Sequence, residues 1–430
     1  MNVPERDTDH TSDSRPPYEY VVIGGGIHGT SLVNYLLAEG GYTHQDICLV
    51  EPHEQLLGSF ERKARQCGMQ TLRSTFVHHI GTEPFSLGSF AEGADREHEL
   101  VSTDNYPNRP TLELFLDHAG YVVDRRDIDE CHLQSRVTGI TENRAGDRLD
   151  VQTAVGTLEA RQVVLAIGLG RSRTVPTWGT SLPDDAPLVH VWDDEFDPTT
   201  AAKFAGPTFV VGGGITAAQC ACSLSEHADV TLLSRHDLEV ELTEAHPYWI
   251  NWRHIEKEVH TLPPGSKARL NRIRAARNDA TIPPYVERRL DEVRGCGGVE
   301  LRRGEITSAY ATDDGLLVRF DDGTTEKNAQ VVLATGLDSV SEHPLVESVA
   351  ESLSLERGAD GFPVLDDRTL AWRGTDGVDS SVYVSGALAE LSVGPLARNI
   401  VGARRVAERL LESRTEADSE RASLAPRGRS

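Results

Sequence analysis

A short stretch near the N-terminus most constrains what this chain can fold into. The apolar run Tyr20–Ile23 is typical of a buried parallel strand, and the glycine-rich segment Gly24–Gly29 follows it at once. Residues 30–38 have the pattern of a helix, and a second apolar run, Ile47–Val50, ends in Glu51. Strand, glycine turn, helix, strand and acid in this order are the fingerprint of a dinucleotide-binding βαβ unit.

Each part of this fingerprint has a physical role. Gly24 lets the chain turn tightly off the strand, Gly26 lets a pyrophosphate approach the backbone, and Gly29 lets helix and strand pack closely. The helix N-terminus presents free N–H groups and a partial positive charge to the phosphates. Glu51 lies where a carboxylate accepts hydrogen bonds from a ribose. We predict nucleotide binding; the alternative is a glycine-rich turn in an ordinary α/β domain.

The chain is long enough, at 430 residues, for two or three domains. It contains no apolar run of 18 residues, so we predict no membrane span. Residues 1–17 are polar and charged, which is unlike a signal peptide and predicts a disordered tail. These features favour a cytoplasmic protein.

The charge balance limits the kinds of molecule that this protein is expected to bind. Acidic residues outnumber basic ones by 67 to 43, which gives a net charge of −24. Such a field opposes binding to nucleic acid or to an anionic membrane. A pervasively acidic, lysine-poor surface favours a halophilic protein of a salt-rich cytoplasm; the alternative is compositional bias on an ordinary acidic surface.

The cysteines predict neither a metal site nor a redox pair. There are six of them, with no CxxC motif and no histidine–cysteine cluster of zinc spacing. Cys220 and Cys222 are the nearest pair, but residues two apart on a helix point to different sides. We expect buried single thiols in a reducing compartment.

The opening pattern occurs a second time. A strand at 209–211 leads into a GxGxxA turn with Gly212, Gly214 and Ala217, followed by a helix at 218–227 and a strand at 230–233. In each half a β-meander then ends in a strand with an Ala-x-Gly sequence; the meanders span 136–160 and 305–327, and the closing strands are 163–168 and 331–336. The repeat predicts an α/β fold of two Rossmann-like dinucleotide-binding domains, each with a β-meander.

The two expected sites differ at the position that selects the nucleotide. Glu51 in the first suits the ribose of FAD. The second strand ends in Ser234 and Arg235 without an acid, and a hydroxyl with an arginine would bind the 2′-phosphate of NADPH. The alternative is that Arg235 is a solvated surface charge.

The last elements close the first domain around the second. A strand at 382–387 contains Gly386, and Gly394–Pro395 begins an expected helix at 396–411, whose positive N-terminus would face the flavin ring. The NADPH domain is therefore expected to be inserted into the FAD domain. The expected bounds are a tail at 1–17, the FAD-binding domain at 18–205 and 339–412, the NAD(P)H-binding domain at 206–338, and a polar tail at 413–430.

These motifs resemble the two-dinucleotide-binding flavoproteins, and among them the NADPH-dependent lysine and ornithine N-hydroxylating flavin monooxygenases. The resemblance covers about residues 18–412. It rests on the two glycine turns and on further matching segments: Met69-Gln70-Thr71, Asn108-Arg109-Pro110, the strand end at Gly168 and the strand end at Gly336. It implies that Gln70 lies beside the flavin. It implies the cofactors FAD and NADPH and leaves the substrate open.

The resemblance also implies a mechanism. NADPH would reduce the flavin, and oxygen would form a flavin C4a-hydroperoxide that oxygenates a small-molecule nucleophile such as an amine. The flavin carries this chemistry, so no catalytic side chain is predicted. Two alternatives remain: an NADPH-dependent flavoprotein reductase that passes electrons to a partner or acceptor, and a non-catalytic flavin-binding protein. The oligomeric state is not predicted.

Overall fold

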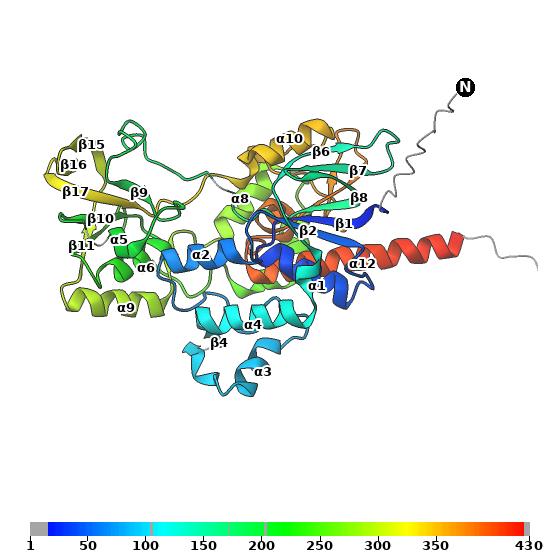
Figure 1. Cartoon of the computed structure of the whole chain (residues 1–430), viewed down its shortest axis with the longest axis horizontal. Coiled ribbons are helices and arrows are strands. Elements are labelled where there is room, and N and C mark those ends of the chain that lie inside the picture. The colour runs from blue at the N-terminus through cyan, green and yellow to red at the C-terminus, as the bar shows by residue number, and fades with distance from the viewer. Residues whose placement is uncertain (1–15, 104–105, 171, 202–203, 425–430) are drawn as a thin grey trace, which may run out of the picture.

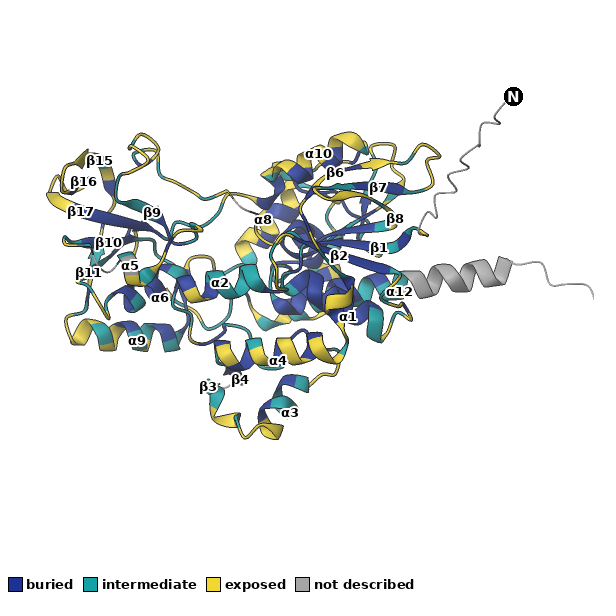
Figure 2. Ribbon diagram, viewed as in Figure 1, coloured by how far each residue is buried: buried dark blue, intermediate teal, exposed yellow. Residues whose placement is uncertain are grey.

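A computed structural model describes residues 16–103, 106–170, 172–201 and 204–424. It contains two large β-sheets, with α2 (Gly58–Gln66) lying between them (Figure 1). The central strands of both sheets are buried, whereas α4 (Leu112–Arg125) and α9 (Pro284–Gly295) expose one face (Figure 2). Nearly all of the expected N-terminal tail, residues 1–17, lies outside the described residues. Within the described part no helix is long and apolar enough to cross a membrane.

The first sheet is built around β1 (Tyr18–Ile23). This strand runs parallel to β2 (Ile47–Glu51) on one side and to β8 (Gly156–Leu165) on the other. The full order is β18-β19-β8-β1-β2-β5, and β6 and β7 form an antiparallel meander with β8. The other bounds are β5 His132–Gln134, β6 Val137–Glu142, β7 Leu149–Thr153, β18 Ala371–Arg373 and β19 Asp379–Val384.

Helices cover this sheet because its strands are apolar on both faces. The helix α1 (Ile27–Ala38) leaves the first glycine turn and packs against the C-terminal α12 (Ile400–Leu424), and α10 (Pro344–Ser352) packs against the meander strand β6. Every residue of β2 is buried, as a parallel strand between two covered faces requires.

The second sheet repeats the plan. Its order is β14-β11-β10-β17-β16-β15, and β9 adds a parallel strand beside β17. The helices α6 (Ile215–Leu224) and α9 (Pro284–Gly295) pack together and cover it. The strands are β9 Leu188–His190, β10 Thr208–Val211, β11 Val230–Ser234, β14 Val299–Arg303, β15 Ile306–Thr312, β16 Gly315–Phe320 and β17 Thr325–Leu333. All of them lie in sequence between β8 and β18, so the second Rossmann-like unit is inserted into the first, as predicted.

A helical segment within the second unit packs against the first. It comprises η3 (Pro247–Ile250), α7 (Trp252–Ile255), the π-helical turn η4 (Glu256–His260) and α8 (Lys267–Ala276). Its apolar residues, Trp249 and Trp252 among them, join the hydrophobic core of the first sheet. Two short paired strands, β12 (Glu239–Val240) and β13 (Thr281–Ile282), connect this segment to the second sheet.

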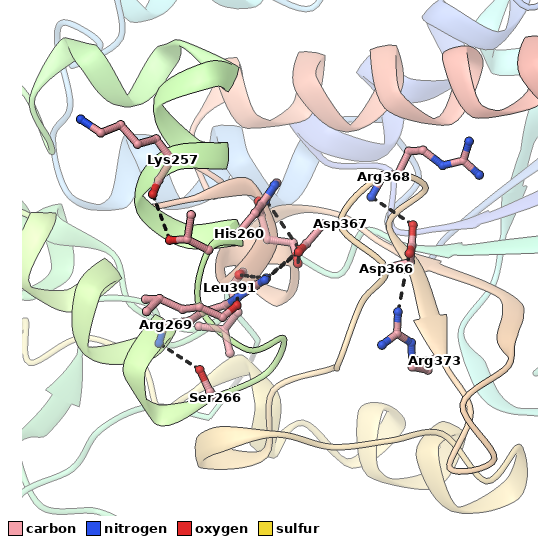
Figure 3. Close-up of polar contacts among 12 residues, drawn as sticks. Lys257, His260, Ser266, Arg269, Asp366, Asp367, Arg368, Arg373 and Leu391 are labelled. Carbon is pink, nitrogen blue, oxygen red and sulfur yellow. Dashed lines mark hydrogen bonds and ion pairs between the residues drawn. The ribbon is translucent and has the colours of Figure 1, made fainter.

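A buried ion pair fixes this segment to the closing part of the chain (Figure 3). Arg269 of α8 is fully buried and binds both carboxylate oxygens of Asp367 at 2.6 Å each. Ser392 donates its hydroxyl to Asp367 at 2.9 Å, and His260 contacts the carbonyl oxygen of Ser392 at 2.8 Å. Three chain segments therefore meet at one charged group.

The excursion after β2 contains little sheet. It comprises α2, α3 (Ser86–Gly93), a hairpin of β3 (Leu100–Thr103) and β4 (Tyr106–Pro110), and α4 (Leu112–Arg125), on which Thr111 forms the N-terminal cap. The remaining short elements are η1 Glu97–Glu99, η2 Ile128–Cys131, α5 Pro198–Ala201, η5 Val340–Glu342, η6 Ala359–Gly361, η7 Gly386–Ala389 and α11 Glu390–Val393.

The expected closing helix, 396–411, was wrong at both ends. The chain forms α11, breaks at Gly394 with φ +93°, and begins α12 only at Ile400. Pro395 thus lies in a buried turn and not in the first helical turn. The helix α12 continues to Leu424, so the polar tail expected from residue 413 is helical up to that point.

Candidate functional site

The first glycine turn has the shape of a phosphate cradle. A methyl group built on Gly24 would lie 2.4 Å from the carbonyl oxygen of Ala166, and one built on Gly29 would lie 1.8 Å from that of Gly24. These two glycines are needed for the close approach of strand, turn and helix. At Gly26 a methyl group would meet nothing within 4 Å, and Gly26 caps α1 without a side-chain partner. The open space and the free helix N-terminus fit a pyrophosphate.

Glu51 is held in a fixed orientation beside this turn. It is buried, its Oε2 accepts a hydrogen bond from Gly25 N at 2.7 Å, and its Oε1 accepts one from His53 N at 3.0 Å. Each carboxylate oxygen has a further lone pair that a ribose hydroxyl can use. Glu51 therefore lies beside the first glycine turn, and its contact with a ribose stays a prediction.

Strand register identifies the equivalent position in the second unit. Ile23 pairs with Val50 and Val211 with Leu233, so Ser234 ends β11 at the position where Glu51 ends β2. The Ser234 hydroxyl does not point to a ligand, however: it is buried and donates to the carbonyl oxygen of His236 at 2.8 Å.

Arg235 is the more available of the two residues predicted to bind a 2′-phosphate. Its side chain is exposed, and within the described part of the chain it forms no hydrogen bond or ion pair. In the turn itself, a methyl group on Gly212 would lie 2.6 Å from the carbonyl oxygen of Ala334, whereas Gly214 faces the backbone of Ala280. Ala217 is buried in the position of the third glycine. The binding roles of these residues remain predictions.

The closing turn brings buried polar atoms to the first site. Gly386 has φ +73° and lies against the ring of His28, whose Nδ1 is 2.9 Å from the Ser385 hydroxyl. Burial lowers the pKa of His28 to about 4, so this imidazole is neutral at pH 7. Sequence reasoning did not identify His28 or Ser385 as site residues; a histidine inside the glycine turn was the available signal.

Three buried polar atoms in this region have no hydrogen-bond partner among the described residues: His28 Nε2, Arg398 Nε and Asn399 Oδ1. Arg398 donates a hydrogen bond to the buried Glu390 at 2.7 Å. Buried polar atoms without partners fit a ligand that supplies hydrogen-bond donors and acceptors, as a flavin ring does. Pro395 lies in the same buried turn.

Of the remaining predicted residues, Gly168 and Gly336 lie just beyond the carboxyl ends of β8 and β17, whereas Gln70 lies in the loop after α2. Gly168 and Gly336 have φ +72° and +89°, and a methyl group on either would meet nothing within 4 Å. Gln70 is exposed, and its carbonyl oxygen accepts a hydrogen bond from Leu112 N at 2.9 Å. The positions of the two glycines match the edge at which open α/β sheets bind ligands.

The cysteines are unsuited to dithiol chemistry. All six are free, and five of them are buried, Cys296 being the exposed one. Burial raises the pKa of Cys220 and of Cys222, which keeps both thiols protonated and unreactive. The expectation of buried single thiols is thus confirmed for five of the six.

Comparisons with known proteins place this geometry among flavoprotein folds. A family model described as FAD-NAD(P)-binding matches residues 21–170. A search of curated protein sequences finds no match.

Three solved structures resemble almost the whole chain. An ornithine N-hydroxylase from Kutzneria sp. 744 has a TM-score of 0.72 at 19% identity, covering 94% of this chain and 100% of its own. An L-lysine 6-monooxygenase from Pseudomonas syringae has 0.70 at 21%, covering 93% and 99%. An ornithine hydroxylase from Pseudomonas aeruginosa has 0.73 at 16%, covering 93% and 98%. The chain shares their fold.

Proposed function

We propose that the protein is an FAD- and NADPH-dependent oxidoreductase that acts as a monooxygenase on a small-molecule amine. The observation that carries the proposal is the duplicated glycine turn, with Glu51 and Ser234 in register-equivalent positions. One unit has a ribose acceptor, and the other has a free arginine beside that position. Two nucleotides of different kind are the simplest ligands for such a pair.

The amine is supported by the structural neighbours. They are an ornithine N-hydroxylase and an L-lysine 6-monooxygenase, and the structure of the former is described with reduced FAD, NADP⁺ and L-ornithine. In the bound state the flavin would supply the redox chemistry with NADPH and oxygen. The protein would bind both nucleotides at its two turns, hold Glu51 toward the ribose through its bonds to Gly25 N and His53 N, and exclude water with the buried closing turn.

The test is oxygen-dependent NADPH oxidation by the flavin-loaded protein. We expect oxidation to require oxygen and to accelerate with ornithine, lysine or a diamine, with formation of a hydroxylated product. Oxidation that needs an added electron acceptor and ignores oxygen would identify a reductase instead. Bound flavin with no NADPH oxidation under any condition would identify a non-catalytic protein.

A double variant addresses dithiol chemistry separately. The change of Cys220 and Cys222 to alanine should leave NADPH oxidation close to the wild-type rate, because both thiols are buried and protonated. A folded, flavin-loaded double variant without NADPH oxidation would favour a thiol reductase.

We also propose that the protein works in the cytoplasm of a salt-rich cell. The support is the net charge of −24 and the six cysteines, which are all unpaired.

A further inference from the structure

The segment after α2, residues 66–73, joins the two units. It belongs to the first unit in sequence, but its backbone and side chains bond to the second. The bonds run from Gln66 Nε2 to the carbonyl oxygens of Asp193 and Phe196, from the Tyr285 hydroxyl to that of Leu72, and from Arg289 Nη1 to that of Gly68. Met69 packs against the hydrophobic cores of both units. This segment is therefore the seam between the proposed sites.

Arg73 makes the densest set of contacts at the seam. Its guanidinium donates to the carbonyl oxygens of Glu241 at 2.6 Å, Leu242 at 3.4 Å and Thr243 at 3.1 Å. It also donates to Thr281, to the carbonyl oxygen at 3.4 Å and to the hydroxyl at 2.8 Å. A planar fork of five N–H donors is suited to such simultaneous bonding.

These acceptors lie on the two chain segments that leave and re-enter the second sheet. The segments pair through β12 and β13, and again where Ala245 bridges Arg277. Arg73 thus bonds across the connection between the second sheet and the helices that pack on the first core. Relative movement of the two units at this point must break its hydrogen bonds.

Arg109 supports Arg73 from the interior. It is fully buried, its Nε donates to the carbonyl oxygen of Arg73 at 3.0 Å, and its Nη1 donates to the Thr103 hydroxyl at 2.6 Å. Neither arginine forms an ion pair with a described carboxylate, although the chain carries a net charge of −24. Backbone carbonyl groups and the Thr281 hydroxyl accept the hydrogen bonds of the Arg73 guanidinium, so its placement depends on those groups.

The element that Arg73 holds lies at the second glycine turn. Thr281 follows Ala280, whose Cα would be 3.5 Å from a methyl group built on Gly214, whereas Gly26 in the first turn faces open space. Ala280 is exposed and has φ +56°, which is unfavourable for a residue with a side chain. Its turn is tied by the bond from the Thr281 hydroxyl to the carbonyl oxygen of Asn278 at 2.8 Å.

We propose that Arg73 is a positioning residue of the second nucleotide site, contributed by the first unit. By holding Thr281, it keeps the turn at residues 278–281 against Gly214 as one wall of that site. The inference rests on the proposed function, because it takes the second glycine turn as the NADPH site. On this proposal, the second nucleotide site is complete only when the two units are in contact at the seam.

The experiment measures NADP⁺ binding to the full-length, flavin-loaded protein by titration calorimetry. Arg73→Ala should weaken NADP⁺ binding by about tenfold or more, because it removes several hydrogen bonds to a charged group. Arg73→Lys should lie between, since an ammonium reaches fewer of the same acceptors. Arg289→Ala is the matched control: it removes another arginine bond at the seam without touching residues 241–243 or 281, and should leave affinity within about twofold.

A second pair of variants guards against a folding defect in Arg73→Ala. Thr281→Val removes the hydroxyl that joins Arg73 to Asn278 and should also weaken NADP⁺ binding, whereas Thr281→Ser keeps it and should bind like wild type. Hydrogen exchange of residues 278–282 should rise in Arg73→Ala and Thr281→Val, while flavin content stays unchanged.

Two results would overturn the inference. One is wild-type NADP⁺ affinity in folded Arg73→Ala or in Thr281→Val, and the other is an equal loss in Arg289→Ala, which would assign the effect to the seam as a whole. Failure of the proposed function is distinct, because the wild type itself would then bind no flavin or no NADP⁺.

Discussion

At the scale of single residues, Gly26 and Gly29 differ in what surrounds their missing side chains. A methyl group on Gly29 would collide with the backbone of Gly24 at 1.8 Å, whereas one on Gly26 would contact nothing within 4 Å. Gly29 is therefore required by the fold. The open space at Gly26 is what the proposed pyrophosphate would need.

We predict that Gly26→Val abolishes flavin binding and leaves the protein folded. The added Cβ would meet no protein atom within 4 Å, and the branched side chain would occupy the place of the proposed pyrophosphate. The measurement is the ratio of bound FAD to protein after incubation with FAD, beside a far-ultraviolet circular dichroism spectrum. Gly29→Ala is the contrasting variant and should lose stability as well. A Gly26→Val protein that keeps its flavin would place the cofactor elsewhere.

Arg235 gives the prediction on nucleotide choice. A charge-assisted bond to a 2′-phosphate contributes about 1.5–3 kcal/mol, which corresponds to roughly a 10- to 150-fold preference for NADPH over NADH. Arg235→Ala should remove most of this preference, because Ser234 donates its hydroxyl to His236 and cannot replace the arginine. Ser234→Asp should favour NADH by restoring a ribose acceptor at the position equivalent to Glu51.

The measurement for Arg235 is anaerobic flavin reduction titrated with each nucleotide. NADH should behave almost alike in wild type and Arg235→Ala, since it has no group at that position. Equal use of both nucleotides by the wild type would show that Arg235 does not contact the phosphate. Arg253, which is exposed on α7, would then be the next residue to change.

At the scale of elements, the Arg269–Asp367 pair holds α8 against the closing part of the chain. Asp367→Ala should cost about 3 kcal/mol, because it leaves a fully buried guanidinium without its carboxylate. Lys267→Ala, on the same helix, removes an exposed ion pair to Asp360 and should cost less than about 1 kcal/mol. The measurement is the urea midpoint of each variant; equal shifts would deny the buried pair its role.

Histidines in the excursion around α3 and α4 predict acid sensitivity. Burial lowers the pKa of His79 to about 4 and that of His118 to about 3. Both are protonated more readily when unfolded, with a pKa near 6.5, so their contribution to stability is present above pH 6.5 and is lost as the pH falls toward 4. Below pH 6.5 each contributes a slope of about 1.4 kcal/mol per pH unit.

The variant His118→Gln should reduce that slope. Glutamine can still bond to the Ser86 hydroxyl, which His118 Nε2 contacts at 2.8 Å, but it does not titrate. The measurement compares denaturant midpoints at pH 7.0 and pH 5.5, where the variant should lose less stability than the wild type. An unchanged difference between the two pH values would mean that His118 is protonated in the folded protein.

The elements that the sequence predicts well are those governed by local patterns. The strand, turn, helix and strand from β1 to β2 and from β10 to β11 lie where their apolar runs and glycines indicate. The start of α12 was not predictable in this way, because Gly394 and a turn through Asn399 delay the helix. The sequence also did not predict which sheet Trp249 and Trp252 pack against, because both join the core of a sheet whose strands are distant in sequence.

The candidate site divides along the same line. Sequence spacing alone identifies the residues of the first turn, and the structure places them together: Gly24, Gly26, Gly29 and Glu51. Arg73 and Ser385 carry no spacing signal, because their partners are 168 and 357 residues away. The hydrogen bond from the Ser234 hydroxyl to the carbonyl oxygen of His236 was likewise not predictable from the sequence, because it depends on the conformation of the turn and not on the residue type.

At the scale of the whole molecule, acidic residues outnumber the basic residues that could pair with them. The chain has 67 acidic and 43 basic residues, and most of its ion pairs have exposed carboxylates, as in the pairs of Arg65 with Glu113 and Arg294 with Asp291. Such pairs contribute little individually. The excess of 24 negative charges therefore acts mainly as mutual repulsion across the surface, which opposes the compact state at low ionic strength.

The last prediction is that stability rises between about 0.1 M and 1 M salt, as the Debye length falls from about 10 Å to about 3 Å. Screening by salt reduces the repulsion among the surplus acidic residues and also weakens the exposed ion pairs. Each exposed pair contributes less than about 1 kcal/mol, so the reduced repulsion should dominate. Arg269 is fully buried and Asp367 is half-buried, so their pair is screened less, and α8 should stay attached to the closing part of the chain. The measurement is the melting temperature in potassium chloride across this range, with sucrose as a control for exclusion from the surface. A melting temperature that stays flat or falls with salt would show that the acidic surface is tolerated without being adapted to high salt.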